Sequence, residues 1–267
     1  MLIWLPPSEG KTAPESGPAL ELESLVLPEL SDARSEAMSA LRALGDGDEA
    51  AQVLGLGRKS AADAALNVTL DTAPCAPAIA LYTGVLYDHL DADSLDHRAR
   101  ARLDEHVWIA SGLFGLVRPS DLIPNHRLAM GVKLPPLGNL ASWWRPRLAR
   151  ALPDLAGRTI VDCRSGAYRA AYLAAESHVL EIAVVEERAA GRKVITHMAK
   201  KWRGLAVRHL IRSPEPGECS SREDVIDALR GLTERPEIIA VEIGDRQLAR
   251  AGGSTTRVTL VTESTEI

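Results

Sequence analysis

The sequence has no long apolar segment and few cysteines. Its uncharged apolar runs fall far short of the roughly 20 residues that a membrane-spanning helix requires. The apolar start, Met1 to Leu5, lacks a positively charged leader and a cleavage site, so we expect no secretory signal. Cys75, Cys163 and Cys219 are widely separated and form no Cys-x-x-Cys pair, which is typical of a reducing compartment. These absences predict a soluble cytoplasmic protein.

Motifs for metals and dinucleotides are also missing from the sequence. The seven histidines form no His-Glu-x-x-His pattern and pair with no cysteine at ligand spacing, so we expect no metal site and no tightly bound iron. A Gly-x-Gly-x-x-Gly fingerprint is absent, because Gly55-Leu56-Gly57 is too short a match. We therefore predict no cofactor.

The segment Pro7 to Thr12 resembles two catalytic motifs in part. Its Gly-Lys-Thr ending is that of a P-loop, but Leu5 stands where the first glycine is needed. Ser8 and Lys11 fit the Ser-x-x-Lys pattern of acyl-transferring serine enzymes, without the Ser-Asp-Asn partner. The remaining prediction is that Lys11 lies in a loop after the first strand, where α/β folds commonly place ligand contacts.

Positive charge is concentrated in one stretch, from Arg192 to Arg212. This stretch holds seven lysines and arginines and no carboxylate, whereas the whole chain has a formal charge of −5. The remainder of the chain is therefore strongly acidic. A basic segment on an acidic protein indicates an anion site, although a solvated helix face is the alternative explanation. The segment is expected to begin as a strand and to continue through Lys200-Lys201-Trp202-Arg203-Gly204 into a helix, a geometry suited to phosphate.

The hydrophobic pattern predicts a mixed α/β fold in a single domain, residues 1–267, without internal repeats. The expected helices are Ser31–Leu44, Asp48–Leu54, Lys59–Leu66, Asp93–Glu105, Asn139–Leu152, Ala167–Ala175 and Ser221–Leu232, besides the basic helix. The expected strands are Leu2–Leu5, Ala78–Tyr82, His106–Ala110, Thr159–Cys163, Ile238–Ile243, Arg257–Val261 and a hairpin of Val179–Val185 with Lys193–Thr196.

Two further segments offer ligand contacts. In Ser111 to Pro119, Gly112 and Gly115 bracket apolar residues ahead of Arg118, so backbone amides there could approach a phosphate, as in helix-hairpin-helix DNA binders. A tight turn packed on the core is the alternative. The segment Asn125 to Lys133 adds Arg127, Lys133 and a titratable histidine.

These segments together resemble the bacterial YaaA family of peroxide-stress proteins. The matching residues are Pro7, Ser8, Lys11 and Thr12; Tyr82-Thr83-Gly84; the block from Ser111 to Ile123; Arg127-Leu128-x-Met130-Gly131; Trp144; and Ala199-Lys200-Lys201-Trp202-Arg203-Gly204. The resemblance extends from residue 1 to about residue 212, and the tail beyond matches poorly. The chain also departs from the family at Arg164-Ser165-Gly166-Ala167-Tyr168, where the family often has Ser-x-Glu-Tyr.

The resemblance implies a single α/β domain with a helix-hairpin-helix-like element and a positively charged cleft that binds DNA. It also implies a role in limiting free iron and in protecting DNA from hydrogen peroxide. The predicted ligand residues are Lys11, Gly112, Gly115, Arg118, Arg127, Lys133, Lys200, Lys201 and Arg203. The partner is then double-stranded DNA, contacted through its phosphates without sequence readout.

An enzyme acting on a nucleotide or another phosphorylated small molecule is the second hypothesis. The same cations would hold the phosphate, and the catalytic candidates are Ser8, Tyr82, Tyr87 and Asp121. A broad groove would favour DNA, whereas a closed pocket would favour catalysis.

Overall fold

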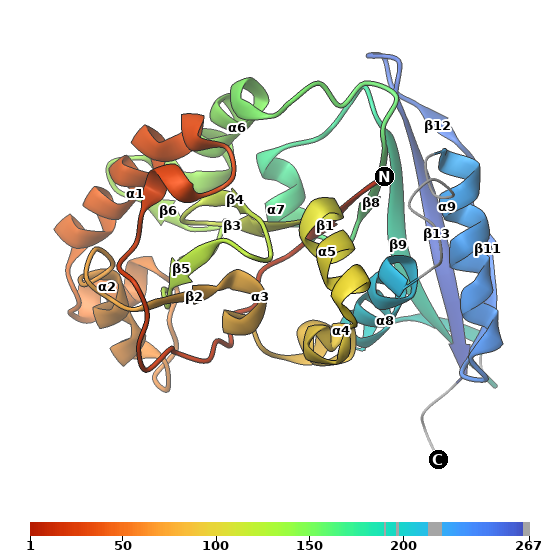
Figure 1. The fold of residues 1–267 in the computed structure, drawn as a ribbon, viewed down its shortest axis with the longest axis horizontal. Coiled ribbons are helices and arrows are strands. Elements are labelled where there is room, and N and C mark those ends of the chain that lie inside the picture. Colours follow the sequence, from red (N-terminus) through yellow and green to blue (C-terminus); the bar gives the residue numbers. More distant parts are fainter. Residues whose placement is uncertain (190, 196–197, 213–220, 264–267) are drawn as a thin grey trace.

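A computed structural model describes residues 1–189, 191–195, 198–212 and 221–263. Its main feature is a mixed sheet with the strand order β11-β13-β9-β8-β1-β3-β4; β10 pairs with β9, and β12 pairs with β13. Figure 1 shows this sheet extending from β4, β3 and β1 near the middle of the molecule to β11 at the right. The strands of the main sheet are β1 (Leu2–Leu5), β3 (Val107–Ser111), β4 (Gly115–Val117), β8 (Thr159–Asp162), β9 (His178–Arg188), β10 (Gly191–Val194), β11 (Ile238–Ile243), β12 (Gln247–Leu248) and β13 (Ser254–Glu263).

The centre of the sheet is parallel. β1 pairs in parallel with β3 on one side and with β8 on the other, and β8, β9 and β13 continue the parallel arrangement. β1, β3 and β8 are buried along their whole length. Strands covered on both faces read as continuous apolar runs, which is why the sequence pattern predicted these three correctly. The mixed α/β fold is thereby confirmed.

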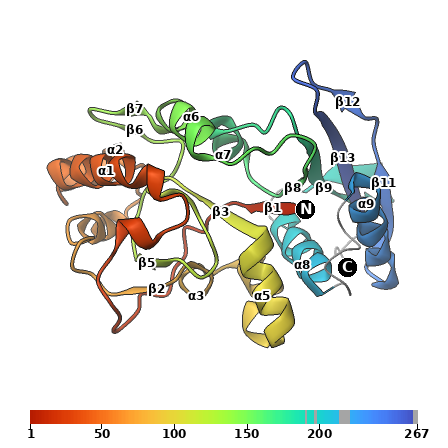
Figure 2. The same cartoon turned by 45° about the horizontal axis from the view of Figure 1, so that its top comes forward.

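Helices lie on the faces and at the left end of this sheet (Figure 1). Their bounds are α1 (Ser31–Leu44), α2 (Asp48–Val53), α3 (Ala78–Leu81), α4 (Val85–Leu90), α5 (His97–His106), α6 (Leu140–Ala151), α7 (Gly166–Ala171), α8 (Ala199–Arg212) and α9 (Arg222–Arg230). In both Figure 1 and Figure 2, α5 lies beside α8, and the two helices are in contact. No helix among the described residues is both long and apolar enough to cross a membrane.

Smaller elements complete the fold. Two short antiparallel pairs lie outside the main sheet, β2 (Cys75–Pro77) with β5 (Leu122–Pro124) and β6 (Lys133–Leu134) with β7 (Gly138–Asn139). The 3-10 helices are Leu22–Ser24, Pro28–Leu30, Ala61–Asn67, Ala92–Ser94 and Gly231–Glu234.

The strand predicted at Ala78–Tyr82 is wrong, because residues 78–81 form the short helix α3. A five-residue apolar run fits a buried strand or a buried helical turn equally well. Here β2 ends at Pro77, and the amides of Ala78 and Ile79 donate to carbonyls of the segment before β5, at 2.9 and 3.0 Å. These contacts turn the chain out of the extended conformation.

The other predicted elements are present with shifted bounds. Helix α1 and strand β11 have the predicted ends, whereas residues 61–67 form a 3-10 helix where an α-helix was expected. The predicted hairpin consists of β9 and β10, and Thr196, its last predicted residue, lies outside the described residues.

The C-terminal part is an integral layer of the sheet. β13 pairs with β9 through ten consecutive residues, and β11 pairs with the other edge of β13. Helix α9 packs against α8 and β11, as Figure 2 also shows. The segment that matched the family poorly in sequence therefore completes the hydrophobic core.

Candidate functional site

A pocket opens at the carboxyl ends of the central parallel strands. It is formed by the loop after β1, the end of β3 and the loop after β8, together with residues of α4 and α8. The chain passes from β1 to β3 on one side and later returns to β8 on the other, and such switch points are where open α/β sheets bind ligands. The cavity volume is about 470 Å³, within the range of small-molecule sites. Its polar lining residues include Ser8, Glu9, Lys11, Thr83, Tyr87, Ser111, His126, Arg127, Ser165, Tyr168, Lys200 and Arg203.

Backbone contacts position the loop that carries Lys11. Lys11 forms an isolated antiparallel bridge with Tyr82, and the amide of Thr83 donates to the carbonyl of Gly10 at 3.1 Å. A side chain on Gly10 would place its Cβ 2.9 Å from the Thr83 hydroxyl, so the two segments are closely packed. The loop after β1 and the loop before α4 therefore form one wall of the pocket.

Arg127 is held in a fixed orientation. Its Nη1 donates to the carbonyl of Glu9 at 2.7 Å, and its Nε lies 3.4 Å from a carboxylate oxygen of Asp63. Its backbone is held by Asn67, whose amide side chain donates to the Arg127 carbonyl at 2.8 Å and accepts from the Arg127 amide at 2.9 Å. Asn67 is buried, so the 3-10 helix that carries it sets the position of the arginine.

Charge and burial shift the pKa values of two neighbouring groups. Burial, reinforced by the Arg127 guanidinium, lowers the pKa of Lys11 to about 8, against the opposing effect of Glu9 and Asp63. Burial, reinforced by Lys11, lowers the pKa of His126 to about 3. The His126 ring is therefore neutral at physiological pH. Its Nδ1 lies 2.9 Å from the Pro124 carbonyl, so this nitrogen carries the proton and Nε2 is an acceptor.

Three tyrosines surround this part of the pocket. The hydroxyl of Tyr87 donates to the Pro6 carbonyl at 2.8 Å, and the Tyr82 and Tyr87 ring centroids are 5.4 Å apart. Burial raises the pKa of each hydroxyl, in the case of Tyr168 to about 12. All three hydroxyls stay protonated at neutral pH, so they can donate hydrogen bonds but cannot act as bases.

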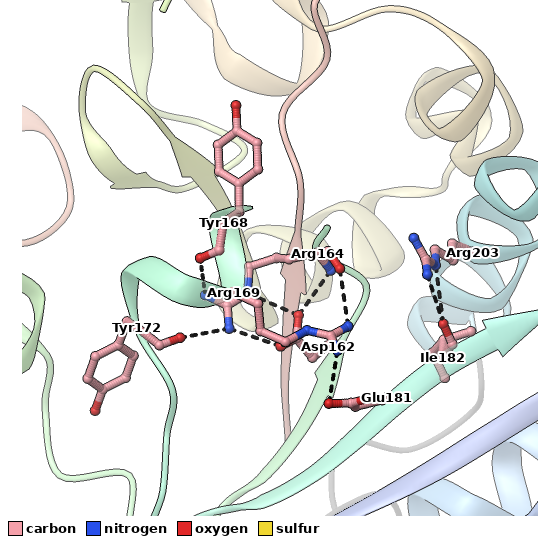
Figure 3. Close-up of polar contacts among 8 residues, drawn as sticks. All are labelled: Asp162, Arg164, Tyr168, Arg169, Tyr172, Glu181, Ile182 and Arg203. Carbon is pink, nitrogen blue, oxygen red and sulfur yellow. Dashed lines mark hydrogen bonds and ion pairs between the residues drawn. The ribbon is translucent and has the colours of Figure 1, made fainter. Parts of the chain in front are cut away.

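Helix α8 contributes two cations to the pocket, Lys200 and Arg203, one turn apart. Arg203 donates from Nε and Nη2 to the Ile182 carbonyl at 3.2 and 3.1 Å, as Figure 3 shows. The helix packs closely against α4 at Gly204, where a Cβ would be only 2.2 Å from the Leu86 carbonyl oxygen. This close contact places the start of α8 at the pocket.

Two other arginines of the basic stretch stabilise the fold. Arg192 pairs with Glu187 and Glu242 across the sheet, at 2.9 Å each. Arg208 donates to the carbonyls of Leu90 and Asp91 at 2.9 and 2.6 Å. Of the seven cations of this stretch, Lys200 and Arg203 therefore line the pocket, whereas Arg192 and Arg208 belong to the structural framework.

Buried ion pairs hold the loop after β8. Arg164 donates from its backbone amide and Nε to Asp162 at 3.0 Å and from Nη2 at 2.9 Å, with both side chains at most 3% exposed. Arg169 continues the network, 3.5 Å from Asp162 and 2.9 Å from Glu181. Figure 3 shows the Tyr168 ring pointing away from these ion pairs. Arg164 is thus a buried structural residue.

Some predicted site residues lie elsewhere. Arg118 and Lys133 are exposed and are not among the residues that line the pocket, and Lys201 lies over the Trp202 ring at 4.5 Å. Asp121 is buried and accepts from the amides of Arg118 and Val26, at 2.9 and 3.1 Å, which is a structural arrangement. The predicted residues that the pocket does bring together are Ser8, Lys11, Tyr87, Gly112, Arg127, Lys200 and Arg203.

The segment from Ser111 to Val117 forms a strand, a tight turn and a strand. Ser111 pairs with Gly115 across the antiparallel β3–β4 hairpin, and Gly115 has a φ of +73°. A Cβ on Gly112 would be 2.3 Å from the Leu128 carbonyl oxygen, so this glycine allows two backbones to meet at the pocket. Gly115 packs instead against Trp144.

Sequence reasoning missed Glu9, Asp63 and Asn67, which hold Arg127. They belong to no motif and come from a loop and a 3-10 helix, so only a multiple alignment or a structure could have identified them. In the part of the chain that the structure describes, no group of three histidine, cysteine or carboxylate side chains could hold a metal ion. Cys75 and Cys163 are buried free thiols, and Cys219 lies outside that part.

The fold and the pocket define an α/β protein with a cationic site at the carboxyl ends of its parallel strands. A family model described as "Peroxide stress protein YaaA" matches residues 1–217, and the chain belongs to this family.

Bacterial relatives share much of the length of the chain. A UPF0246 protein of Streptomyces coelicolor is 42% identical over 250 residues, which cover 92% of this chain and 95% of the relative. A UPF0246 protein of Corynebacterium efficiens is 40% identical over 242 residues, covering 89% and 95%. One from Dinoroseobacter shibae is 34% identical over 203 residues, covering 70% and 74%. The similarity to the first two therefore covers most of the chain.

Proposed function

We propose that this protein binds DNA in and around the pocket through phosphate contacts, without sequence readout, and so limits oxidative DNA damage and free iron during peroxide stress. The observation that carries the proposal is the convergence of Lys11, Arg127, Lys200 and Arg203 on one pocket of an acidic protein. Family membership supports the role in peroxide stress. Binding of DNA requires a cytoplasmic location, as the sequence predicts.

The arrangement of the arginines suits phosphate. Arg127 and Arg203 each use part of the guanidinium to hold a backbone carbonyl, so both are oriented before a ligand arrives. A planar guanidinium presents paired donors that match phosphate oxygens. The exposed cations Arg118 and Lys133 could contact further DNA phosphates outside the pocket. The helix-hairpin-helix element implied by the resemblance remains a prediction, and the Ser111–Val117 hairpin does not supply it.

A second candidate is an enzyme acting on a nucleotide or another phosphorylated small molecule. The observation in its favour is the size of the cavity, about 470 Å³, at the switch point of the sheet. The same cations would hold the phosphate group.

The test measures binding to random-sequence and defined duplexes over a series of salt concentrations, in parallel with a panel of nucleotides and sugar phosphates. Under the DNA proposal both duplexes bind equally, because phosphates are common to all sequences. The double variant Lys200→Ala/Arg203→Ala removes two cations that line the pocket and reduces the slope of log affinity against log salt by roughly 2, since each lost phosphate contact is worth about 0.9.

Arg230→Ala is the matched control. This residue pairs with Asp227 on α9 and does not line the pocket, so its loss should leave the salt slope unchanged. If the wild-type protein binds no duplex at low salt but binds a phosphorylated small molecule, the second candidate replaces the first. Binding to neither ligand would refute a phosphate site altogether.

A further inference from the structure

Lys11 is placed unusually for a structural lysine. Its Nζ lies 5.5 Å from the Tyr82 ring centroid, on the wall of the pocket. Among the described residues, no carboxylate comes within ion-pair distance of this nitrogen, and the nearby acids Glu9 and Asp63 are engaged with Arg127. The amine is thus available to a ligand in the pocket.

The lowered pKa of Lys11 makes its neutral, nucleophilic form accessible. A lysine reacts through its neutral form, and burial beside another cation is the standard way to populate that form. With a pKa lowered to about 8, the neutral fraction at pH 7 is roughly 300 times that of a lysine with the ordinary value of 10.5.

The surrounding groups can hold and polarise a ligand that carries both a phosphate and a carbonyl. Arg127, Lys200 and Arg203 line the same pocket and can take the phosphate, which leaves the Lys11 amine for the second group. Tyr168 lines the same pocket and keeps its proton, so its hydroxyl can donate to a carbonyl oxygen.

We propose that Lys11 forms an imine with an aldehyde or ketone that carries a phosphate group. This inference rests on the phosphate binding proposed above. The Nζ lone pair attacks the carbonyl carbon, and a proton passes from nitrogen to the carbonyl oxygen, giving a carbinolamine. Loss of that hydroxyl with a second proton releases one water and leaves the carbon–nitrogen double bond, so no oxidant or reductant is consumed. Two sources present this chemistry: the open sugar of an abasic site in DNA, and a free sugar phosphate.

The experiment traps the imine with sodium cyanoborohydride, which reduces it to a stable secondary amine. The wild-type protein is incubated with a duplex containing one abasic site or with ribose 5-phosphate, and adducts are located by peptide mass mapping. We expect the adduct on Lys11, formed at least about 10 times faster than on any other lysine. Trapping of the abasic duplex assigns the DNA source, and trapping of ribose 5-phosphate alone assigns a small molecule.

Two variants and one probe serve as controls. Lys11→Arg keeps the positive charge and removes the nucleophile, so trapping at this position should be lost. Lys193→Arg changes an exposed lysine on β10, away from the lining of the pocket, and should trap like the wild type. Unphosphorylated ribose should react at least about 10 times more slowly than ribose 5-phosphate.

The outcomes separate this proposal from the one on which it rests. If duplex or sugar phosphate binds but no adduct forms on Lys11, the imine is refuted and phosphate binding stands. Equal trapping of ribose and ribose 5-phosphate would refute the role of the phosphate. Mapping of the wild-type adduct decides the site even if Lys11→Arg folds poorly.

Discussion

The buried pair of Asp162 and Arg164 gives a sharp test of how the pocket is supported. Asp162→Ala removes the carboxylate that accepts three donors of Arg164 and faces Arg169 (Figure 3). Because Arg164 is only 3% exposed, its charge would lose its closest anionic partner in a dry environment and keep only the Tyr168 and Tyr172 carbonyls and the Trp4 ring. Breaking such a pair costs about 3–5 kcal/mol. At about 2 °C per kcal/mol for a chain of this size, the melting temperature should fall by about 6–10 °C.

Calorimetry and urea unfolding measure this loss, with Asp227→Ala as the matched control. Asp227 pairs with Arg230 on the surface of α9, where both side chains are more than half exposed, so its loss should cost at most about 1 kcal/mol. The double variant Asp162→Leu/Arg164→Met should recover much of the stability, because an apolar replacement leaves no buried charge. A loss below about 1 kcal/mol for Asp162→Ala would refute the reasoning and show that water reaches Arg164.

Two further predictions concern groups at and near the pocket. The pKa of His126 is lowered to about 3 in the folded protein, so below its ordinary value of 6.5 only the unfolded chain takes up the proton. The free energy of unfolding should therefore fall on acidification, by about 2 kcal/mol between pH 7 and pH 5. In His126→Asn this contribution to the pH dependence should vanish. If the free energy of unfolding in urea changes equally with pH in the two proteins, the prediction is contradicted. Gly204→Ala should lower the free energy of unfolding in urea by about 1–3 kcal/mol, because its Cβ would meet the Leu86 carbonyl oxygen. The control Gly57→Ala has open space around the new Cβ and should change the free energy of unfolding by at most about 0.5 kcal/mol. A stabilised Gly204→Ala would show that α4 and α8 can separate freely.

The central strands and the long helices could be predicted from the sequence, but the supports of the pocket could not. Thr159–Asp162 has a β-branched, apolar centre, and Leu2–Leu5 is a continuous apolar run, so both strands follow from composition. The apolar run at Ala78 to Tyr82 has the same composition and is helical, because hydrogen bonds to the segment before β5 outweigh the local preference. Local pattern is therefore reliable only where no distant backbone competes.

The structure brings some of the predicted cations to one pocket and leaves others outside it. Lys11 and Arg127 lie 116 positions apart, and they meet because Arg127, in the loop after β5, donates to the Glu9 carbonyl in the loop after β1 while Asn67 holds its backbone. Arg118 and Lys133 have the same residue types and loop positions, yet they are exposed and do not line the pocket. Residue type alone does not distinguish these two outcomes.

The sequence by itself determined the fold class, the family and the residue types from which an anion site could be built, because apolar periodicity and charge are local properties. Only the tertiary structure determines which cations line the pocket and which bind carboxylates and carbonyls elsewhere in the fold. Lys200 and Arg203 are pocket residues because Gly204 lets α8 approach α4, whereas Arg192 and Arg208 are used by distant carboxylates and carbonyls. The lowered pKa of Lys11 likewise depends on burial by the folded chain and on Arg127, which is distant in the sequence.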